Sequence, residues 1–277
     1  MNINILISTY GDRIQNCPRV LLPEHEFIEY VIVHQTSSSS SIELPKDLYR
    51  GDVTIIQQNE RGVTRSRNLA IDSAKGDILI FADDDVSYQL DRVLNVRKVY
   101  LERPELDVAL FKIQTKKGEP EYKSYASEGF RLSRITQSVS TPEITARRAR
   151  LNSKKIYFDE RFGAGRRWII GGDESFFIED CLKSSLQVHY FPYYLAVHPY
   201  ESTVKQLPEN DIRLACVTGA VDAKRNGGIA LFKAFGAPIR RWRSFREKSV
   251  NPISYTLARF LSALYILVTE RAQRRTH

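Results

Sequence analysis

The chain has 277 residues, of which 42% are hydrophobic and 27% are charged. This composition is typical of a folded globular protein with a substantial core, and it excludes a disordered or collagen-like chain. The three cysteines (Cys17, Cys181 and Cys216) lack C-x-x-C spacing, which argues against a disulfide scaffold. The N-terminal residues show no signal-peptide pattern, which argues against secretion. The sequence contains no run of about 18 uncharged apolar residues, which argues against a membrane span.

Short β-rich runs alternate with helical segments along the first half of the chain. The pattern predicts strands at 3–8, 30–34, 53–57, 77–81 and 106–113, and helices at 63–74 and 89–103. Further short strands are expected at 188–192 and 194–197, and the serine run 37–41 is expected to be a loop. This βαβ rhythm predicts an α/β fold with a mostly parallel sheet covered by helices, in which ligands bind beyond the carboxyl ends of the strands.

Three adjacent carboxylates, Asp83, Asp84 and Asp85, follow the fourth predicted strand. Their charges repel one another, and a divalent cation with oxygen ligands, Mn²⁺ or Mg²⁺, would relieve that repulsion and bridge to phosphate oxygens. On its own, however, such a triplet is also typical of a solvated turn or a helix cap.

The residues that precede the triplet add several further motifs. The segment 58–85 begins Gln-Asn-Glu-Arg-Gly-Val-Thr-Arg-Ser-Arg-Asn and ends Ala-Lys-Gly-Asp-Ile-Leu-Ile-Phe-Ala-Asp-Asp-Asp. It resembles the signature of the family 2 glycosyltransferases with the GT-A fold, in which an Asn-x-Gly loop, a helix with Ala-Arg-Asn and an Ala-x-Gly-Asp turn precede a DxD-type motif. Ser66 stands where that family usually has Ala, and the opening Ile-Leu-Ile-Ser-Thr-Tyr looks like the family's first strand and nucleotide-binding turn.

This resemblance implies a role for each matching position. Asp85 would ligate the Mn²⁺ or Mg²⁺ that joins the protein to the diphosphate of the donor. The residues implied in donor binding are Thr9, Tyr10, Asn59, Arg67, Asp83 and Asp84. The structural alternatives are a surface Arg67 paired with Asp72 and a Thr9 that caps a helix. His34-Gln35-Thr36 replaces the acidic residues that usually follow the family's second strand, so the choice between a UDP-sugar and a GDP-sugar stays open.

A second acidic cluster lies in the segment 158–177. Its residues Phe158 to Phe162 and Gly172 to Phe177 resemble the family's Phe-Asp-Glu-x-Phe segment and its Gly-Glu-Asp-x-x-Phe motif, with the order of the two acids reversed. The resemblance implies that Asp173 or Glu174 is the catalytic base that takes the proton from the acceptor hydroxyl. Alignment by the preceding glycine and by Phe177 places Glu174 at the family's base position, whereas alignment by residue type places Asp173 there. Without the resemblance, two acids at this place are typical of a helix N-terminus.

Three more positions are implied by the same resemblance. Trp168 and Gly172, just before the acidic pair, are expected to bind the acceptor. His198 is followed by Ser202-Thr203, as is often seen in the family, which implies a place in the metal shell or beside a phosphate. A lone histidine is otherwise more often structural.

The excess of basic residues lies entirely in the C-terminal region. Residues 222–277 contain twelve Lys/Arg and three Asp/Glu, whereas the other 221 residues contain 29 basic and 30 acidic side chains, and the formal net charge of the chain is +8. This asymmetry predicts a near-neutral domain over 1–221 and a basic helical region over 222–277. Apolar residues at helical spacing over 253–268 are typical of a helix on an anionic bilayer surface. Packing on the main domain is the alternative, and nucleic-acid binding is disfavoured.

Together, the resemblance and the charge pattern predict a metal-dependent inverting glycosyltransferase of the hexosyltransferase type. The expected acceptor is a glycan or lipid-linked glycan of a bacterial capsule, O-antigen or lipopolysaccharide, and the expected place is the cytoplasmic face of the membrane. A sugar-phosphate nucleotidyltransferase would require a Gly-rich phosphate loop after the first strand, where residues 9–13 are a poor match although Arg13 is present. A non-catalytic sugar- or membrane-binding module is disfavoured by the presence of both acidic clusters.

Overall fold

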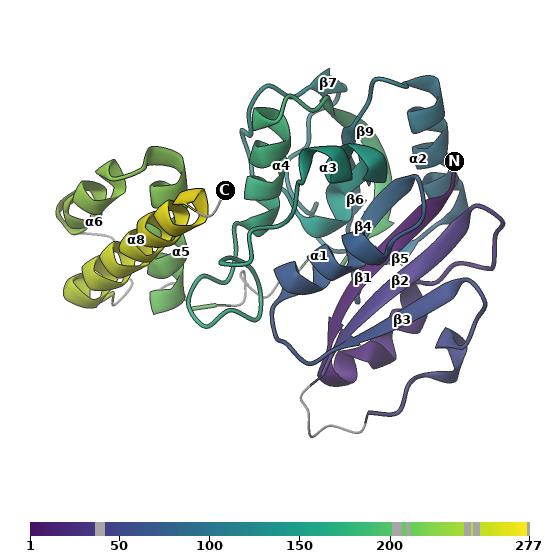
Figure 1. Cartoon of the computed structure of the whole chain (residues 1–277), viewed down its shortest axis with the longest axis horizontal. Helices are drawn as coiled ribbons and strands as arrows, with labels where there is room; N and C mark the ends of the chain where they lie inside the picture. Colours follow the sequence, from purple (N-terminus) through teal and green to yellow (C-terminus); the bar gives the residue numbers. More distant parts are fainter. Residues whose placement is uncertain (37–41, 201–206, 209–210, 241–244, 246–249, 276–277) are drawn as a thin grey trace. The chain divides into compact units, whose positions relative to one another are not determined.

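The computed structural model describes residues 1–36, 42–200, 207–208, 211–240, 245 and 250–275 (Figure 1). The serine run 37–41, the pair Ser202-Thr203 and the basic residues Arg241, Arg243 and Arg246 lie outside these described residues. The chain forms two compact units. The first comprises Met1–Glu160 and Asp173–Tyr200, and the second comprises Arg161–Gly172 and Glu201–His277.

The first unit is built on one mixed sheet, which confirms the predicted α/β fold. Four parallel neighbours run in the order β3 (Val53–Gln58), β2 (Ile28–Gln35), β1 (Ile3–Tyr10) and β4 (Ile78–Asp83). The apolar runs of β1 and β4 are nearly continuous because strands in the middle of a parallel sheet are covered on both faces, whereas the edge strand β3 has no fully buried residue. Seven of the eight residues of β1, for example, are buried.

Beyond β4, antiparallel pairs interrupt the parallel order. The strands that follow are β8 (Ile144–Arg147), β6 (Val108–Gln114) and β9 (Val188–Val197), with the two-residue strands β5 (Ser87–Tyr88) and β7 (Phe130–Arg131) paired to β9. β8 is antiparallel to both of its neighbours, whereas β6 and β9 are parallel to each other. β9 is one continuous strand where the sequence predicts two, and β8 is too short to give a strong sequence pattern.

Helices cover both faces of this sheet (Figure 1). On one face, apolar side chains of β1 pack with the 3₁₀ helix η1 (Gly11–Val20) and with α2 (Leu90–Glu102). On the other face, α1 (Val63–Ser73), α3 (Arg148–Lys154) and α4 (Asp173–Lys183) pack around Phe81, Phe158 and Phe177. This layering leaves the carboxyl ends of β1, β2, β3 and β4 at one edge, together with the loops that follow them.

The second unit contains three helices among its described residues, α5 (Ile212–Asn226), α6 (Ile229–Arg240) and α8 (Pro252–Arg275). α5 and α8 approach closely at Gly219, where an added Cβ would lie 2.1 Å from the Arg259 carbonyl oxygen. Arg259 is buried on the side of α8 that faces α5, and its guanidinium pairs with Asp222. The expected boundary at residues 221 and 222 therefore falls within α5, which packs with the helices that follow it.

α8 exposes a row of apolar side chains on the surface of the second unit. The row has helical spacing and consists of Ile253, Leu257, Leu261, Leu264, Tyr265 and Val268. By length and composition, Pro252–Arg271 suffices to cross a membrane, with a mean hydropathy of 1.3 and 22% of the apolar window buried. The sequence argument against a membrane span rested on an uninterrupted uncharged run, which Arg259 breaks. A single helix of this kind is weak evidence for a span, since helices of soluble proteins satisfy the same criterion.

Candidate functional site

The acidic triplet lies at the edge formed by the carboxyl ends of the strands. Asp83 is the last residue of β4, and it pairs in register with Ser8 of β1. Asp84 points inward, where its Oδ2 accepts a 2.7 Å hydrogen bond from the Thr9 hydroxyl. Thr9 is therefore held by an acid of the triplet and does not cap a helix.

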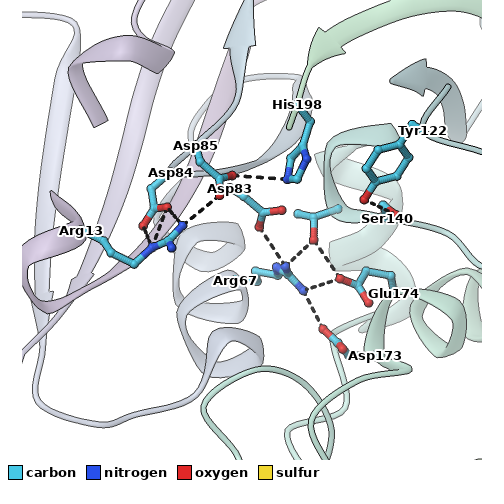
Figure 2. A network of polar contacts seen from close by, with 11 residues as sticks. Arg13, Arg67, Asp83, Asp84, Asp85, Tyr122, Ser140, Asp173, Glu174 and His198 are labelled. Atoms are coloured by element: carbon cyan, nitrogen blue, oxygen red, sulfur yellow. Dashed lines mark hydrogen bonds and ion pairs between the residues drawn. The ribbon is translucent and has the colours of Figure 1, made fainter. Parts of the chain in front are cut away.

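Asp83, Asp85 and His198 form a group with the chemistry of a metal site. Their ligand atoms lie within 4.8 Å of one another. His198 follows β9, and its Nδ1 lies 2.5 Å from the Pro199 carbonyl oxygen, while its Nε2 lies 3.4 Å from Asp85 Oδ1 (Figure 2). Asp85 Oδ1 is buried, and apart from this long contact with His198 no described residue donates a hydrogen bond to it. Two carboxylates and an imidazole fit Mn²⁺, and carboxylates also suit Mg²⁺.

The electrostatics of this group favour a cation. Burial alone would raise the pKa of Asp85, but His198 and Arg13 outweigh burial and lower that pKa. Burial likewise acts to lower the pKa of His198, and Asp85 and Asp83 outweigh it, so the pKa of this imidazole is raised. The pKa of Asp83 is raised by its burial, against the opposing effect of Arg67. Positive charge placed here thus has two carboxylates to stabilise it.

Arg67 brings the two acidic clusters together. It lies on α1 with only 5% of its side chain exposed, and its Nη2 is 3.2 Å from Asp83 Oδ1 while its Nη1 is 2.6 Å from Asp173 Oδ2 (Figure 2). The same Nη1 lies 3.3 Å from Glu174 Oε1. The alternative of a surface Arg67 paired with Asp72 is therefore wrong: Asp72 instead accepts a hydrogen bond from the Tyr157 hydroxyl.

Asp173 and Glu174 open α4 side by side but differ in exposure. The Asp173 side chain is 3% exposed and Glu174 is 20% exposed, and Glu174 also accepts a 2.9 Å hydrogen bond from the Thr141 hydroxyl. Burial raises the pKa of Asp173, and the charge of Glu174 raises it further, against the opposing effect of Arg67. The pair thus combines one accessible carboxylate with one that is enclosed against a guanidinium.

The residues expected at the base and ribose lie at the ends of the parallel strands. Tyr10 ends β1 with 41% of its surface exposed, and the Arg61 guanidinium lies over its ring at 4.9 Å. Asn59 follows β3 and accepts a 3.4 Å hydrogen bond from Thr36. Gln35 is buried, and its Oε1 accepts a 2.7 Å hydrogen bond from the Gly62 amide. Neutral polar groups and the Arg61 guanidinium, with no acidic side chain among these named residues, therefore lie at the ends of β1, β2 and β3.

Trp168 and Gly172 belong to the second unit. The segment Arg161–Gly172 is tied to α8 by Arg161, which donates a 2.8 Å hydrogen bond to the Thr269 hydroxyl and lies 3.6 Å from Glu270. Trp168 is 48% exposed, with the Arg167 guanidinium 5.1 Å from its ring, and Gly172 has a φ of 97° that favours glycine. The expected acceptor residues thus share a compact unit with the basic C-terminal helices.

Two contributors to the site were not among the expected residues. Arg13 contacts Asp84 and Asp85, and Thr141 contacts Arg67 and Glu174. Thr141 lies between Ser140 and Glu143, and the Ser140 amide donates a 2.7 Å hydrogen bond to Glu143. The Ser-x-x-Glu spacing of a capping box was the available signal for an ordered turn at this place.

Comparison with known proteins identifies relatives at the level of family and fold. The sequence model of the family described as "Glycosyl transferase family 2" matches residues 5–169. No curated protein matches the chain. Among solved structures, S. aureus TarS is similar with a TM-score of 0.56 and 17% identity, over 80% of this chain and 39% of the TarS chain.

Two ligand complexes of TarS residues 1–349 are also similar. The complex with UDP has a TM-score of 0.58 and 17% identity over 80% of this chain and 65% of that chain. The complex with UDP-GlcNAc has a TM-score of 0.56 and 16% identity over 83% of this chain and 70% of that chain. Identities this low show a shared fold. The acidic pair at the start of α4 lies beyond the residues matched by the family.

Proposed function

The chain belongs to glycosyl transferase family 2, and on this premise we propose that it transfers one sugar from a nucleotide-sugar donor to an acceptor hydroxyl with inversion at the anomeric carbon. One observation carries the proposal: a single guanidinium, that of Arg67, contacts Asp83 of the acidic triplet and also both Asp173 and Glu174 at the start of α4. The carboxylates suited to holding a diphosphate-bound cation and the carboxylates suited to abstracting a proton are thus joined by one arginine. An inverting displacement requires this proximity because attack and departure occur in the same step.

The role of catalytic base is assigned to Glu174. Its carboxylate would take the proton of the acceptor hydroxyl while that oxygen bonds to the anomeric carbon. The bond from the anomeric carbon to the donor diphosphate breaks, and its electron pair leaves with the nucleoside diphosphate. The greater exposure of Glu174 supports this choice over Asp173, whose side chain is enclosed against Arg67. Asp173 would then act as a positioning residue through Arg67.

Asp85 and His198, together with Asp83, would hold Mn²⁺ or Mg²⁺. The buried Asp85 Oδ1, which faces His198 Nε2 at 3.4 Å, and the mixed donor set support this assignment. When bound, such a cation supplies Lewis-acid stabilisation of the negative charge on the departing nucleoside diphosphate.

The donor would lie along the ends of β1, β2 and β3. Tyr10 and Asn59 would contact the base and ribose. Thr9 and Asp84, which are buried and hydrogen-bonded to each other, would support the donor-binding surface from within the domain. The TarS complexes with UDP and UDP-GlcNAc support a UDP-sugar, with a GDP-sugar as the alternative.

The acceptor would be a lipid-linked glycan of a bacterial surface polymer, and the enzyme would work on the cytoplasmic face of the membrane. Arg259, the one charged side chain between Ile253 and Val268, is paired with Asp222, so the exposed apolar row of α8 is uncharged. Burying a large apolar side chain contributes roughly 1.5–3 kcal/mol, and each basic residue near an anionic surface about 1 kcal/mol. A net charge of +9 over residues 222–277, from twelve basic and three acidic side chains, supports an anionic bilayer as the partner.

A donor panel tests the reaction directly. The protein is incubated with UDP- and GDP-sugars in the presence of Mn²⁺, and free nucleoside diphosphate is measured with and without a lipid-linked acceptor. Release that depends on donor, acceptor and Glu174 supports sugar transfer. Release of pyrophosphate from a nucleoside triphosphate and a sugar phosphate would instead show a nucleotidyltransferase, and no turnover of any donor would favour a binding module.

Vesicle sedimentation tests the membrane proposal. Leu261→Asp places a charge in the exposed row of α8 and is expected to weaken binding to anionic vesicles. Leu101→Asp is the matched control, because Leu101 is a comparably exposed leucine of the first unit, on α2. Equal binding of both variants and the parent protein would reject the proposed membrane surface.

A further inference from the structure

Arg13 lies beside the candidate metal group and has no role in the function proposed above. It belongs to η1, which follows β1 directly. Its Nε lies 3.0 Å from both carboxylate oxygens of Asp84, and its Nη2 contacts Asp84 and lies 3.1 Å from Asp85 Oδ2 (Figure 2). The guanidinium thus bridges two acids of the triplet.

Asp84 fixes the position of this guanidinium. It is buried, and the Thr9 hydroxyl holds its Oδ2 from β1. A buried carboxylate anchored in this way orients the Nε and Nη2 edge of Arg13 without a metal or substrate. The arginine is therefore preorganised, and little rotamer freedom is lost when a ligand binds its other edge.

That other edge is available. A guanidinium has five N–H donors, and the contacts of Arg13 use the Nε and Nη2 groups. Within the part of the chain that the structure describes, no acceptor is bonded to Nη1, and the side chain is 54% exposed. The two N–H groups of Nη1 can thus donate to a ligand.

Arg13 and the candidate metal group share one carboxylate. Asp85 Oδ2 lies 3.1 Å from Arg13, whereas its Oδ1 lies 3.4 Å from His198. A ligand at this edge would meet both a cation site and a fixed guanidinium. Planar N–H forks suit phosphate oxygens, and paired positive groups suit a diphosphate more than any single phosphate.

We propose that Arg13 binds the donor diphosphate through its Nη1 edge, beside the cation held by Asp83, Asp85 and His198. The inference rests on the proposed function, since it assumes a nucleoside diphosphate as the leaving group. Arg13 would hold the diphosphate in the ground state and stabilise the negative charge that grows on it as the sugar departs. The rival role is that of a structural counter-ion for buried Asp84.

Calorimetry with Mn²⁺ alone and with Mn²⁺ plus inorganic pyrophosphate separates these roles, because pyrophosphate carries no base or sugar. Arg13→Gln is expected to bind Mn²⁺ alone as tightly as the parent protein or more tightly, because a repelling charge has gone. Its affinity for pyrophosphate in the presence of Mn²⁺ is expected to fall roughly 10- to 100-fold, the equivalent of one charge-assisted interaction. Arg13→Lys keeps the charge but lacks the fork, and it is expected to lie between the two.

Two further variants keep the test independent of folding. The double variant Arg13→Gln, Asp84→Asn removes both the arginine and its buried partner, so no unpaired buried carboxylate is left to destabilise the fold. It is expected to show the same loss of pyrophosphate binding as Arg13→Gln alone. Arg50→Gln is the matched control, because Arg50 forms a similar two-pronged pair with Asp52 before β3. Undiminished pyrophosphate binding by the Arg13 variants would overturn the inference and leave the proposed function standing. Absence of Mn²⁺ binding by the parent protein would overturn the metal site and the inference together.

Discussion

Arg67→Met isolates the energetic role of the guanidinium that joins the two acidic clusters. Methionine keeps a long unbranched side chain and removes the charge. Arg67 is 5% exposed and lies between 2.6 and 3.3 Å from Asp83, Asp173 and Glu174. Removing one partner of a buried ion pair costs about 3–5 kcal/mol because uncompensated charge is left behind. We expect the free energy of unfolding to fall by that amount near neutral pH.

This loss is expected to shrink in acid. Arg67 lowers the pKa of Asp173 and of Asp83 against the raising effect of burial, so its removal raises both values further. A carboxyl group whose pKa is raised in the folded state binds protons that the unfolded chain releases, and stability then rises as the pH falls. The pKa of Asp173 is already raised to about 8 with Arg67 in place, so between about pH 7.5 and about pH 5.5 the extra proton uptake of the variant falls on Asp83. The cost of the substitution should therefore be smaller at about pH 5.5 than at about pH 7.5.

Urea unfolding followed by far-UV circular dichroism in EDTA measures both effects. Arg65→Met is the control on the same helix, because Arg65 is 34% exposed and pairs with the exposed acids Glu60 and Glu160. Exposed pairs contribute about 1 kcal/mol or less, so this variant should lose little stability at either pH. A loss below about 1 kcal/mol for Arg67→Met, or an equal loss at both pH values, would refute the charge argument.

Three further predictions concern the site and its surroundings. Glu174→Gln should reduce turnover by about 10²- to 10⁴-fold without lowering the free energy of unfolding, because it relieves repulsion with Asp173. A larger loss of turnover for Asp173→Asn would move the base to Asp173. His198→Ala should weaken Mn²⁺ binding in calorimetry by about tenfold or more, and unchanged affinity would remove it from the metal group. Arg161→Met and Thr269→Val both remove the Arg161–Thr269 contact, and Arg161→Met also removes the pair with Glu270, so both should raise the acceptor KM, Arg161→Met by the larger factor, and leave the donor KM unchanged. Additive effects in the double variant would contradict a shared contact.

The strands and their acidic ends could be predicted because the signals are local. A run such as Ile3–Ser8 is apolar at nearly every position, and this pattern survives only in a strand covered on both faces. The acids that follow Phe81 then fall at the carboxyl edge of a parallel sheet. The strand β8 escaped prediction because four residues inserted antiparallel between β4 and β6 owe their place to their neighbours.

The side-chain contacts within the site could not be predicted because they join residues that are far apart in the sequence. Arg67 and Asp173 are 106 positions apart, and nothing in their local sequence shows that they meet. Helical spacing alone also allowed Arg67 to be a surface residue. Similarly, Asp173 and Glu174 are adjacent in the sequence. Only the folded structure shows that the Asp173 side chain is enclosed and that the Glu174 side chain is more accessible.

The balance of charge in the site indicates an order of binding. Five carboxylates, those of Asp83, Asp84, Asp85, Asp173 and Glu174, face the guanidiniums of Arg13 and Arg67, so the formal charge of the site is −3 when every acid is ionised and His198 is neutral. The raised pKa of Asp83, Asp173 and His198 is the response of the site to this excess of negative charge and reduces it in the absence of a ligand. A diphosphate that approached this site alone would meet like charge, whereas a divalent cation would lower the excess to −1 and leave Arg13 facing the ligand. Cation and donor are therefore expected to bind with positive coupling, and by linkage each should raise the affinity of the other by the same factor.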